Sequence, residues 1–391
     1  MRVTRTLRAT VGAALTGALF LGTAGWAAAD ESGNDQWPLT AFDAAKIHEQ
    51  ATGKGVTVAV VDVGFFVDHQ DVAGKFLAGH DFPNSTAEGD FQPTPGEDPR
   101  THGTTMSALI AGHGHGAGGR QGLKGLAPDA KILPLSADKK SSEAIRYAAD
   151  HGADVINLAF VADKNTPDLC PAVHYAVEKG AVVVAGVGND GLSEKNLPAG
   201  CPGAIGVGAV DEYGKFWDGS NYNSTVDLLA PGVEAPVLTG DGKSYGKSSG
   251  TSISTAYVSA SVALLKEKFP DLTPGQIANR LVKTAGLPAS AQKEGLKLPD
   301  AHYGYGFIKP LVALTRDIPA GPAAGPLPMP EGKASKTPVV AGADKGKDPD
   351  PPMGGKQAVL LYGGIGLGVV IVLGVIIGGV ALARRKANAV S

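Results

Sequence analysis

The sequence predicts an α/β fold of three layers, in which a mostly parallel sheet lies between helices. Apolar runs of strand length recur along the chain, at 56–61, 131–135, 154–159, 181–187 and 204–209. Such continuous runs are typical of parallel strands, because helices cover both faces of a parallel sheet. Helical patterns alternate with the runs, at 104–112, 141–151 and 171–179. Polar residues end two of the runs, and active groups of open α/β sheets gather at the carboxyl ends of strands.

Three polar residues stand at the ends or starts of these elements. Asp62 follows the run 56–61, and Asn189 closes the run that begins at Ala181. Both therefore fall at strand ends, where a site is expected. His102 begins His-Gly-Thr-Thr-Met-Ser-Ala-Leu-Ile-Ala-Gly, which predicts a helix that opens on the histidine.

Ser252 lies where the small residues Ser-Ser-Gly-Thr lead into a run of helix formers. Free backbone N–H groups and the helix dipole at such a position stabilise developing negative charge. A serine hydroxyl needs a base, and the order Asp62, His102, Ser252 is one of the known chain orders of the catalytic triad. The α/β-hydrolase order begins with serine in a Gly-x-Ser-x-Gly elbow, which is absent around Ser252. The sequence therefore disfavours the alternative of a Ser/His/Asp esterase.

These stretches together resemble the subtilisin-like serine proteases, or subtilases, over roughly residues 54–311. Further segments are similar to recurring ones of that family: Gly-Leu-Ala-Pro-Asp-Ala-Lys-Ile-Leu at 125–133, Asp-Val-Ile-Asn-Leu at 154–158 and Ala-Pro-Gly at 230–232. The resemblance implies a subtilisin-like fold. It also implies a serine endopeptidase that uses no cofactor and hydrolyses peptide bonds through an acyl-enzyme.

The resemblance also assigns roles to residues. Asp62, His102 and Ser252 would form the triad, with Ser252 as nucleophile, His102 as base and Asp62 orienting the imidazole. The Asn189 side chain and the Ser252 backbone N–H would form the oxyanion hole. Substrate contacts are expected from four residues: Leu158, Ala159, Phe160 and Gly188.

Several positions depart from the family pattern. Val63 follows the aspartate where a small hydroxylated residue is usual, Thr105 replaces a frequent second histidine, and Ala256 replaces the usual proline of the serine motif. Ala-Phe-Val at 159–161 replaces Ser-Leu-Gly on the substrate-binding strand. Because Phe160 would narrow the cleft, we expect narrow specificity.

The two ends of the chain carry targeting patterns. Basic residues and an apolar run at 11–26 precede Ala-Ala-Ala at 27–29, which predicts a signal peptide over 1–29; an uncleaved anchor is the alternative. Residues 358–383 carry no charge, so we predict a transmembrane helix over 357–383. The basic tail 384–391 would lie in the cytoplasm, which places the catalytic domain outside a cell membrane crossed once.

Between these ends we predict three regions: an N-terminal extension at 30–53, the catalytic domain at 54–316 and a Pro/Gly-rich linker at 317–356. This layout is similar to that of the mycosins, membrane-anchored proteases associated with type VII secretion systems. That resemblance implies a lipid bilayer around the C-terminal helix, a secretion-system membrane complex as partner and a few polypeptide substrates. An assembly component in which proteolysis is secondary remains the alternative.

Cysteine, histidine and charge content narrow the remaining functions. Cys170 and Cys201 would form a disulfide outside the cytoplasm, and the loop closed by this bridge would contain Asn189. Two buried free thiols are the alternative. His113 and His115 could suggest a metal site, but no acidic or cysteine residue stands nearby in sequence, so we predict none. A formal net charge of −3 gives no reason to propose a nucleic-acid partner.

Overall fold

The computed structural model describes residues 36–82, 101–162, 166–293 and 295–330. Within these ranges a seven-stranded sheet has the order β2-β5-β1-β6-β7-β8-β9, and every neighbouring pair in it is parallel. The strands are β1 (Thr57–Asp62), β2 (His80–Asp81), β5 (Lys131–Ser136), β6 (Val155–Leu158), β7 (Val182–Gly186), β8 (Ala204–Val210) and β9 (Leu228–Pro231). The predicted α/β fold with a mostly parallel sheet is confirmed.

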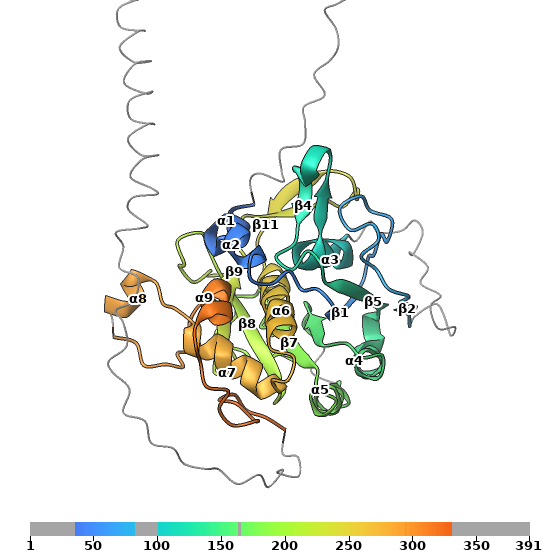
Figure 1. The fold of residues 1–391 in the computed structure, drawn as a ribbon. Coiled ribbons are helices and arrows are strands. Elements are labelled where there is room, and N and C mark those ends of the chain that lie inside the picture. The colour runs from blue at the N-terminus through green and yellow to red at the C-terminus, as the bar shows by residue number, and fades with distance from the viewer. Residues whose placement is uncertain (1–35, 83–100, 163–165, 294, 331–391) are drawn as a thin grey trace, which may run out of the picture.

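Helices cover both faces of this sheet (Figure 1). Alternate residues of β1 belong to different cores: Val58 and Val60 pack with α3 and α6, whereas Ala59 and Val61 pack with α4 and α5. The first face is covered by α3 (His102–Ala111), α6 (Thr251–Lys268), α7 (Pro274–Thr284) and α9 (Pro310–Thr315). The second is covered by α4 (Ser141–Asp150) and α5 (Leu169–Glu178). Burial on both faces explains why the strands were predicted from apolar runs.

Helix α6 is the centre of the first core. All but a few of its residues are buried, and many of them are small, so the helix lies close to the strands beneath it. Ser259 donates a hydrogen bond to the side chain of Asn157 on β6 at 3.0 Å. Ser252, at the start of this helix, is thereby held at a fixed depth relative to the sheet.

Two hairpins that the sequence did not predict lie above α3 (Figure 1). One pairs β3 (His113–His115) with β4 (Gln121–Lys124) around a short 3₁₀ turn at Ala117–Gly119; a second 3₁₀ turn, Asp138–Lys140, lies outside the hairpins and directly before α4. The other pairs β10 (Ala235–Leu238) with β11 (Tyr245–Ser248) and leads directly into α6. A small apolar cluster of Val72, Ala108, Leu123 and Leu238 joins both hairpins to α3.

The N-terminal extension packs on the catalytic domain. Its helices are α1 (Trp37–Phe42) and α2 (Ala44–His48), separated by Asp43 in a left-handed conformation. The Trp37 indole donates to the carbonyl of Val233 at 3.1 Å, and the Phe42 ring meets the buried Tyr257 ring of α6 edge-on.

The C-terminal part of the described chain is also fixed to the domain. The short helix α8 (Ala289–Lys293) lies on the surface. The Arg280 guanidinium donates hydrogen bonds to the carbonyls of Ala313 in α9 and of Arg316 and Ile318 after it. Leu327 is buried. The first residues of the segment predicted to be a linker, 317–330, therefore pack on the domain.

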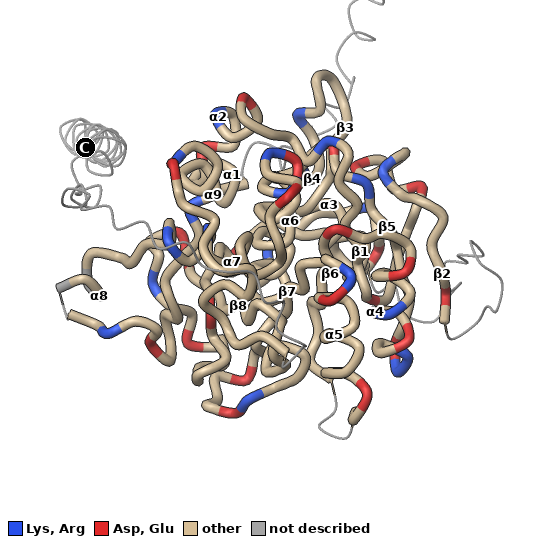
Figure 2. The backbone as a smooth tube through the Cα atoms, turned by 60° about the horizontal axis from the view of Figure 1, so that its bottom comes forward, with Lys and Arg blue, Asp and Glu red and all other residues tan. Residues whose placement is uncertain are grey.

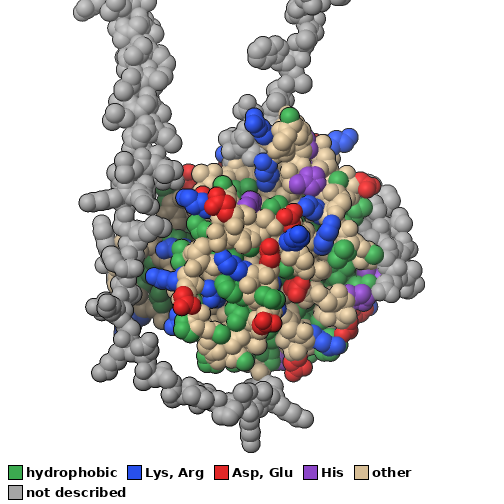
Figure 3. Space-filling view, in the orientation of Figure 1, with side chains coloured by type: hydrophobic (Ala, Val, Ile, Leu, Met, Phe, Trp, Pro, Cys, Tyr) green, Lys and Arg blue, Asp and Glu red, His purple; other side chains and the backbone are tan. Residues whose placement is uncertain are grey.

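The remaining predicted segments fall outside the described residues: the signal peptide 1–29, the rest of the linker, the transmembrane helix 357–383 and the tail 384–391. None of the helices in residues 36–82, 101–162, 166–293 and 295–330 has both the length and the apolar character needed to cross a bilayer. Acidic and basic positions are scattered among each other over the tube of Figure 2, and both signs are interspersed on the face shown in Figure 3.

Candidate active site

Asp62 and His102 form a close carboxylate–imidazole pair. Asp62 is the last residue of β1 and His102 the first of α3, and His102 Nδ1 lies 2.8 Å from each carboxylate oxygen. The buried Asp62 also accepts the Val63 backbone N–H at 2.7 Å. The negative charge of Asp62 raises the pKa of His102, against the opposing effect of burial. A carboxylate at Nδ1 holds the proton there and leaves Nε2 as the basic nitrogen.

Local backbone contacts fix this pair. The N–H groups of Gly103 and Thr104 donate to the carbonyls of Val63 and Gly64, so the first turn of α3 is tied to the loop after β1. Gly103 lies against the ring of Phe65, where an added Cβ would come within 2.8 Å of the ring carbons. A glycine after His102 is therefore required by this packing.

Ser252 shares a cleft with the pair. Its cleft of about 400 Å³ is lined by Thr101, His102, Asn189, Ser248, Gly250 and Ser252. The Ser252 hydroxyl donates to the carbonyl of Ala159 at 2.9 Å. For nucleophilic attack the hydroxyl must leave that carbonyl and donate to Nε2 of His102 instead.

Asn189 is oriented by the residue before the serine. Its Oδ1 accepts both the backbone N–H of Thr251 at 2.8 Å and the Thr251 hydroxyl at 2.9 Å. With Oδ1 occupied, the Nδ2 amide remains as a donor on the cleft side. A Cβ on Gly250 would lie 3.5 Å from that Nδ2, so the glycine keeps the space beside the donor open. Thr251, which positions this amide, was not singled out from the sequence.

The four residues expected to contact substrate are placed differently from one another. Leu158 is fully buried, with its side chain in the core, and Ala159 is nearly so. Gly188 has a φ of +109°, and a Cβ there would meet the amide nitrogens of Asn221 and Asn196. Phe160 lines a larger cleft of about 760 Å³ beside Asp62, whose other walls include Val63, Lys139, Lys140 and Val161.

Cys170 and Cys201 form the predicted disulfide. It joins the start of α5 to the turn before β8, and the loop that it closes contains Asn189. The bridge thus braces the segment that carries the candidate oxyanion donor.

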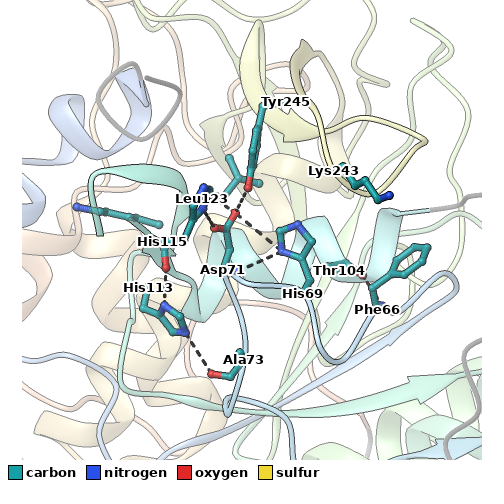
Figure 4. Close-up of polar contacts among 12 residues, drawn as sticks. Phe66, His69, Asp71, Ala73, Thr104, His113, His115, Leu123, Lys243 and Tyr245 are labelled. Carbon is teal, nitrogen blue, oxygen red and sulfur yellow. Dashed lines mark hydrogen bonds and ion pairs between the residues drawn. The ribbon is translucent and has the colours of Figure 1, made fainter. Parts of the chain in front are cut away.

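The histidines His113 and His115 are engaged within the protein (Figure 4). His115 Nδ1 lies 2.7 Å from Oδ1 of Asp71, and His113 contacts the carbonyls of Gly114 and Ala73. The acidic partner of His115 lies 44 residues earlier in the chain, so the sequence around the two histidines does not contain it. Among the described residues no three His, Cys, Asp or Glu side chains are grouped so that they could hold a metal ion.

Comparison with known proteins identifies the family of the chain. Residues 53–306 match the Peptidase_S8 profile, the subtilase family. The chain is 40% identical over 219 residues to the thermophilic serine proteinase of Bacillus sp. (strain AK1). The aligned region covers 54% of this chain and only about half, 52%, of that proteinase. It is 30% identical to mycosin-1 of Mycobacterium tuberculosis, over 74% of this chain and 75% of the mycosin.

A solved structure gives the same result for the fold. The crystal structure of MycP1 from the ESX-1 type VII secretion system superposes with a TM-score of 0.61 at 29% identity, covering 74% of this chain and 88% of that one. The family match spans more than half of the chain and includes β1, α3, β7 and α6, the elements that carry the candidate site. The chain belongs to the subtilase family of serine proteases.

Proposed function

We propose that this chain is an extracytoplasmic serine endopeptidase, anchored in the cell membrane by its C-terminal helix, in which Asp62, His102 and Ser252 form the triad. The observation that carries the proposal is the 2.8 Å contact between His102 Nδ1 and Asp62, in a histidine that lines the same cleft as Ser252. A carboxylate-held imidazole beside a helix-start serine is the arrangement needed to activate a hydroxyl.

The reaction then follows from the roles of these groups. His102 Nε2 takes the Ser252 proton as the oxygen attacks the peptide carbonyl, and Asp62 stabilises the imidazolium that forms. The Asn189 amide and the Ser252 backbone N–H stabilise the oxyanion. His102 returns the proton to the leaving amine, and water hydrolyses the acyl-enzyme by the same steps.

A test of the nucleophile is labelling with a fluorophosphonate, which reacts with activated serines. We expect the intact chain to be labelled, Ser252→Ala to be unlabelled, and Ser248→Ala to be labelled as the unchanged chain is. Ser248 is the matched control because it lines the same cleft. An unlabelled but folded chain would instead support the alternative of an assembly component in which proteolysis is secondary.

The membrane anchor and the secretion partner rest on other observations. The anchor is supported by the uncharged segment 358–383 and the basic residues after it. The similarity to a protease from a type VII secretion system supports a secretion complex as partner and a narrow set of secreted polypeptides as substrates. We expect alkaline carbonate to leave the full chain in the membrane fraction and to release a chain that lacks 357–391.

A further inference from the structure

Asn221 is a buried amide next to the loop that carries the candidate oxyanion donor. It belongs to the segment between β8 and β9 and has no exposed surface. Asn189, in contrast, is exposed on the loop that follows β7. Loops are more mobile than the strands that they follow, and a catalytic group must keep its direction closely. The exposed donor therefore needs contacts that hold its backbone.

The side-chain oxygen of Asn221 binds the outer part of this loop. Its Oδ1 accepts the backbone N–H groups of Asp190 and Leu192, each at 3.0 Å. The Asp190 N–H belongs to the peptide unit that joins Asn189 to Asp190. This hydrogen bond therefore fixes the peptide unit that follows the donor residue.

The other polar groups of Asn221 bind the inner part of the loop. Nδ2 donates to the Val187 carbonyl at 3.3 Å, and the Asn221 backbone N–H donates to the Gly188 carbonyl at 2.9 Å. The Gly188 carbonyl belongs to the peptide unit that joins Gly188 to Asn189. Asn221 thus holds both peptide units that flank the oxyanion donor.

Gly188 allows the amide groups to approach the loop closely. Its φ is +109°, and an added Cβ would lie 2.6 Å from Asn221 Nδ2 and 2.8 Å from Asn196 Nδ2. Asn196 Nδ2 donates to the same Val187 carbonyl at 3.3 Å. Glycine suits both the positive φ and the close approach. The backbone before Asn189 is therefore shaped to fit against these buried amides.

We propose that Asn221 is a positioning residue for the reaction, which directs Asn189 Nδ2 towards the oxyanion. This role rests on the proposed function, in which Asn189 stabilises the oxyanion. Thr251 orients the side chain of Asn189 through Oδ1, whereas Asn221 holds the main chain from which that side chain extends. Because Asn221 is fully buried, it acts through Asn189 and not on the substrate.

The test is a double-mutant cycle in the full chain, with kcat and KM measured on a peptide substrate. Asn221→Ala removes the acceptor of the Asp190 and Leu192 N–H groups, so the loop should shift and kcat should fall by about 10²-fold. KM should change little, because the oxyanion forms only on the way through the transition state. In the Asn189→Ala background, Asn221→Ala should have almost no further effect on kcat, since the donor that it displaces is already absent.

Two further variants separate positioning from loss of stability. Asn223→Ala is the matched control, because Asn223 is 9% exposed on the same segment and bonds to Glu194 and Thr225. We expect it to lower the urea midpoint without changing kcat per folded molecule. Asn221→Asp keeps an acceptor for the two N–H groups and loses the donor to Val187. It should lower kcat less than Asn221→Ala, again only when Asn189 is present, and it provides the cycle if the alanine variant does not fold.

The outcomes distinguish this role from the proposed function. If the unchanged chain hydrolysed no peptide, or if Asn189→Ala left kcat unchanged, both the assignment of the oxyanion hole and the role of Asn221 would be wrong. If Asn189→Ala lowers kcat by about 10²–10³-fold, as loss of an oxyanion donor should, the role of Asn221 is tested alone. Effects of Asn221 and Asn189 that multiply independently, an effect of Asn221→Ala on KM only, or an equal fall in kcat in Asn223→Ala would then overturn it.

Discussion

Two aspartate–histidine pairs in this molecule have nearly the same geometry and very different surroundings. His102 Nδ1 lies 2.8 Å from Asp62, and His115 Nδ1 lies 2.7 Å from Asp71. The His102 side chain is 40% exposed and faces a cleft that also contains Ser252. The His115 side chain is 18% exposed, and its ring stacks on Tyr245. The distance between carboxylate and imidazole is therefore nearly the same in the two pairs and does not identify a catalytic one. The pairs differ in the surroundings of the imidazole: His102 shares a cleft with Ser252, whereas His115 stacks on Tyr245.

The Asp71 pair instead ties three segments together (Figure 4). The fully buried Asp71 carboxylate accepts hydrogen bonds from Leu123 N–H on β4 at 2.7 Å and from the Tyr245 hydroxyl on β11 at 2.8 Å. Asp71 itself lies on the segment that follows Asp62 along the chain. Because β11 leads into α6, this cluster holds in place the hairpin that borders the candidate active site.

The largest expected effect comes from breaking the Asp62–His102 pair at the cleft. Asp62→Asn should keep the shape of the site but favour the wrong imidazole tautomer, and kcat should fall by about 10⁴-fold. Above the folded pKa of His102 this change should cost little stability. Hydrolysis of a peptide substrate and the urea midpoint would be measured on the same preparation. A variant that keeps a tenth of the activity would show that Asp62 does not orient the base.

The corresponding change in the buried pair should have the opposite signature. Asp71→Asn replaces one carboxylate oxygen by an amide donor, which would face at least one of the groups that the carboxylate now contacts: His115 Nδ1, the Leu123 N–H or the Tyr245 hydroxyl. A buried donor left without an acceptor costs about 1–3 kcal/mol of the unfolding free energy. We expect a lower urea midpoint, with kcat per folded molecule changed far less than in Asp62→Asn. His113→Ala, at an exposed neighbour on the same hairpin, is the control with a small expected effect. A large fall in kcat without a stability change would contradict the structural role of Asp71.

The two regions also differ in how far the sequence could predict them. The strands and helices around Asp62, His102 and Asn189 were predicted because burial on both faces produces apolar runs. The hairpins were missed because β11, Tyr-Gly-Lys-Ser, is partly exposed and shows no apolar pattern. The contact of Asp71 with His115 joins distant segments, which no local pattern encodes. The Ala159 carbonyl that accepts the Ser252 hydroxyl is a backbone group and leaves no trace in residue type.

Histidine titration gives the smallest effect and separates the regions by sign. The Asp62 charge raises the pKa of His102 above its ordinary 6.5, so this pair contributes stability below 6.5 that is lost as pH rises through the folded pKa. Burial lowers the pKa of His69, with Asp71 acting in the opposite direction and His115 in the same one. His69 accepts the Asp71 backbone N–H through Nδ1, and only a neutral imidazole can do so. The contribution of His69 to the free energy of unfolding is therefore lost as pH falls through its lowered pKa.

Melting temperatures measured across pH would therefore resolve two opposite dependences. Asp62→Asn should remove the loss of stability on the alkaline side of pH 6.5, and His69→Asn should remove the loss on the acid side. Activity needs neutral His102, so it should rise as pH increases through the raised pKa of His102. The stabilising effect of the Asp62–His102 pair should disappear over the same pH range. The opposite result would be that His69→Asn alters the pH profile of activity and leaves the acid side of the stability curve unchanged. That result would contradict the assignment of proton transfer to the Asp62–His102 pair and of a structural role to His69 and Asp71.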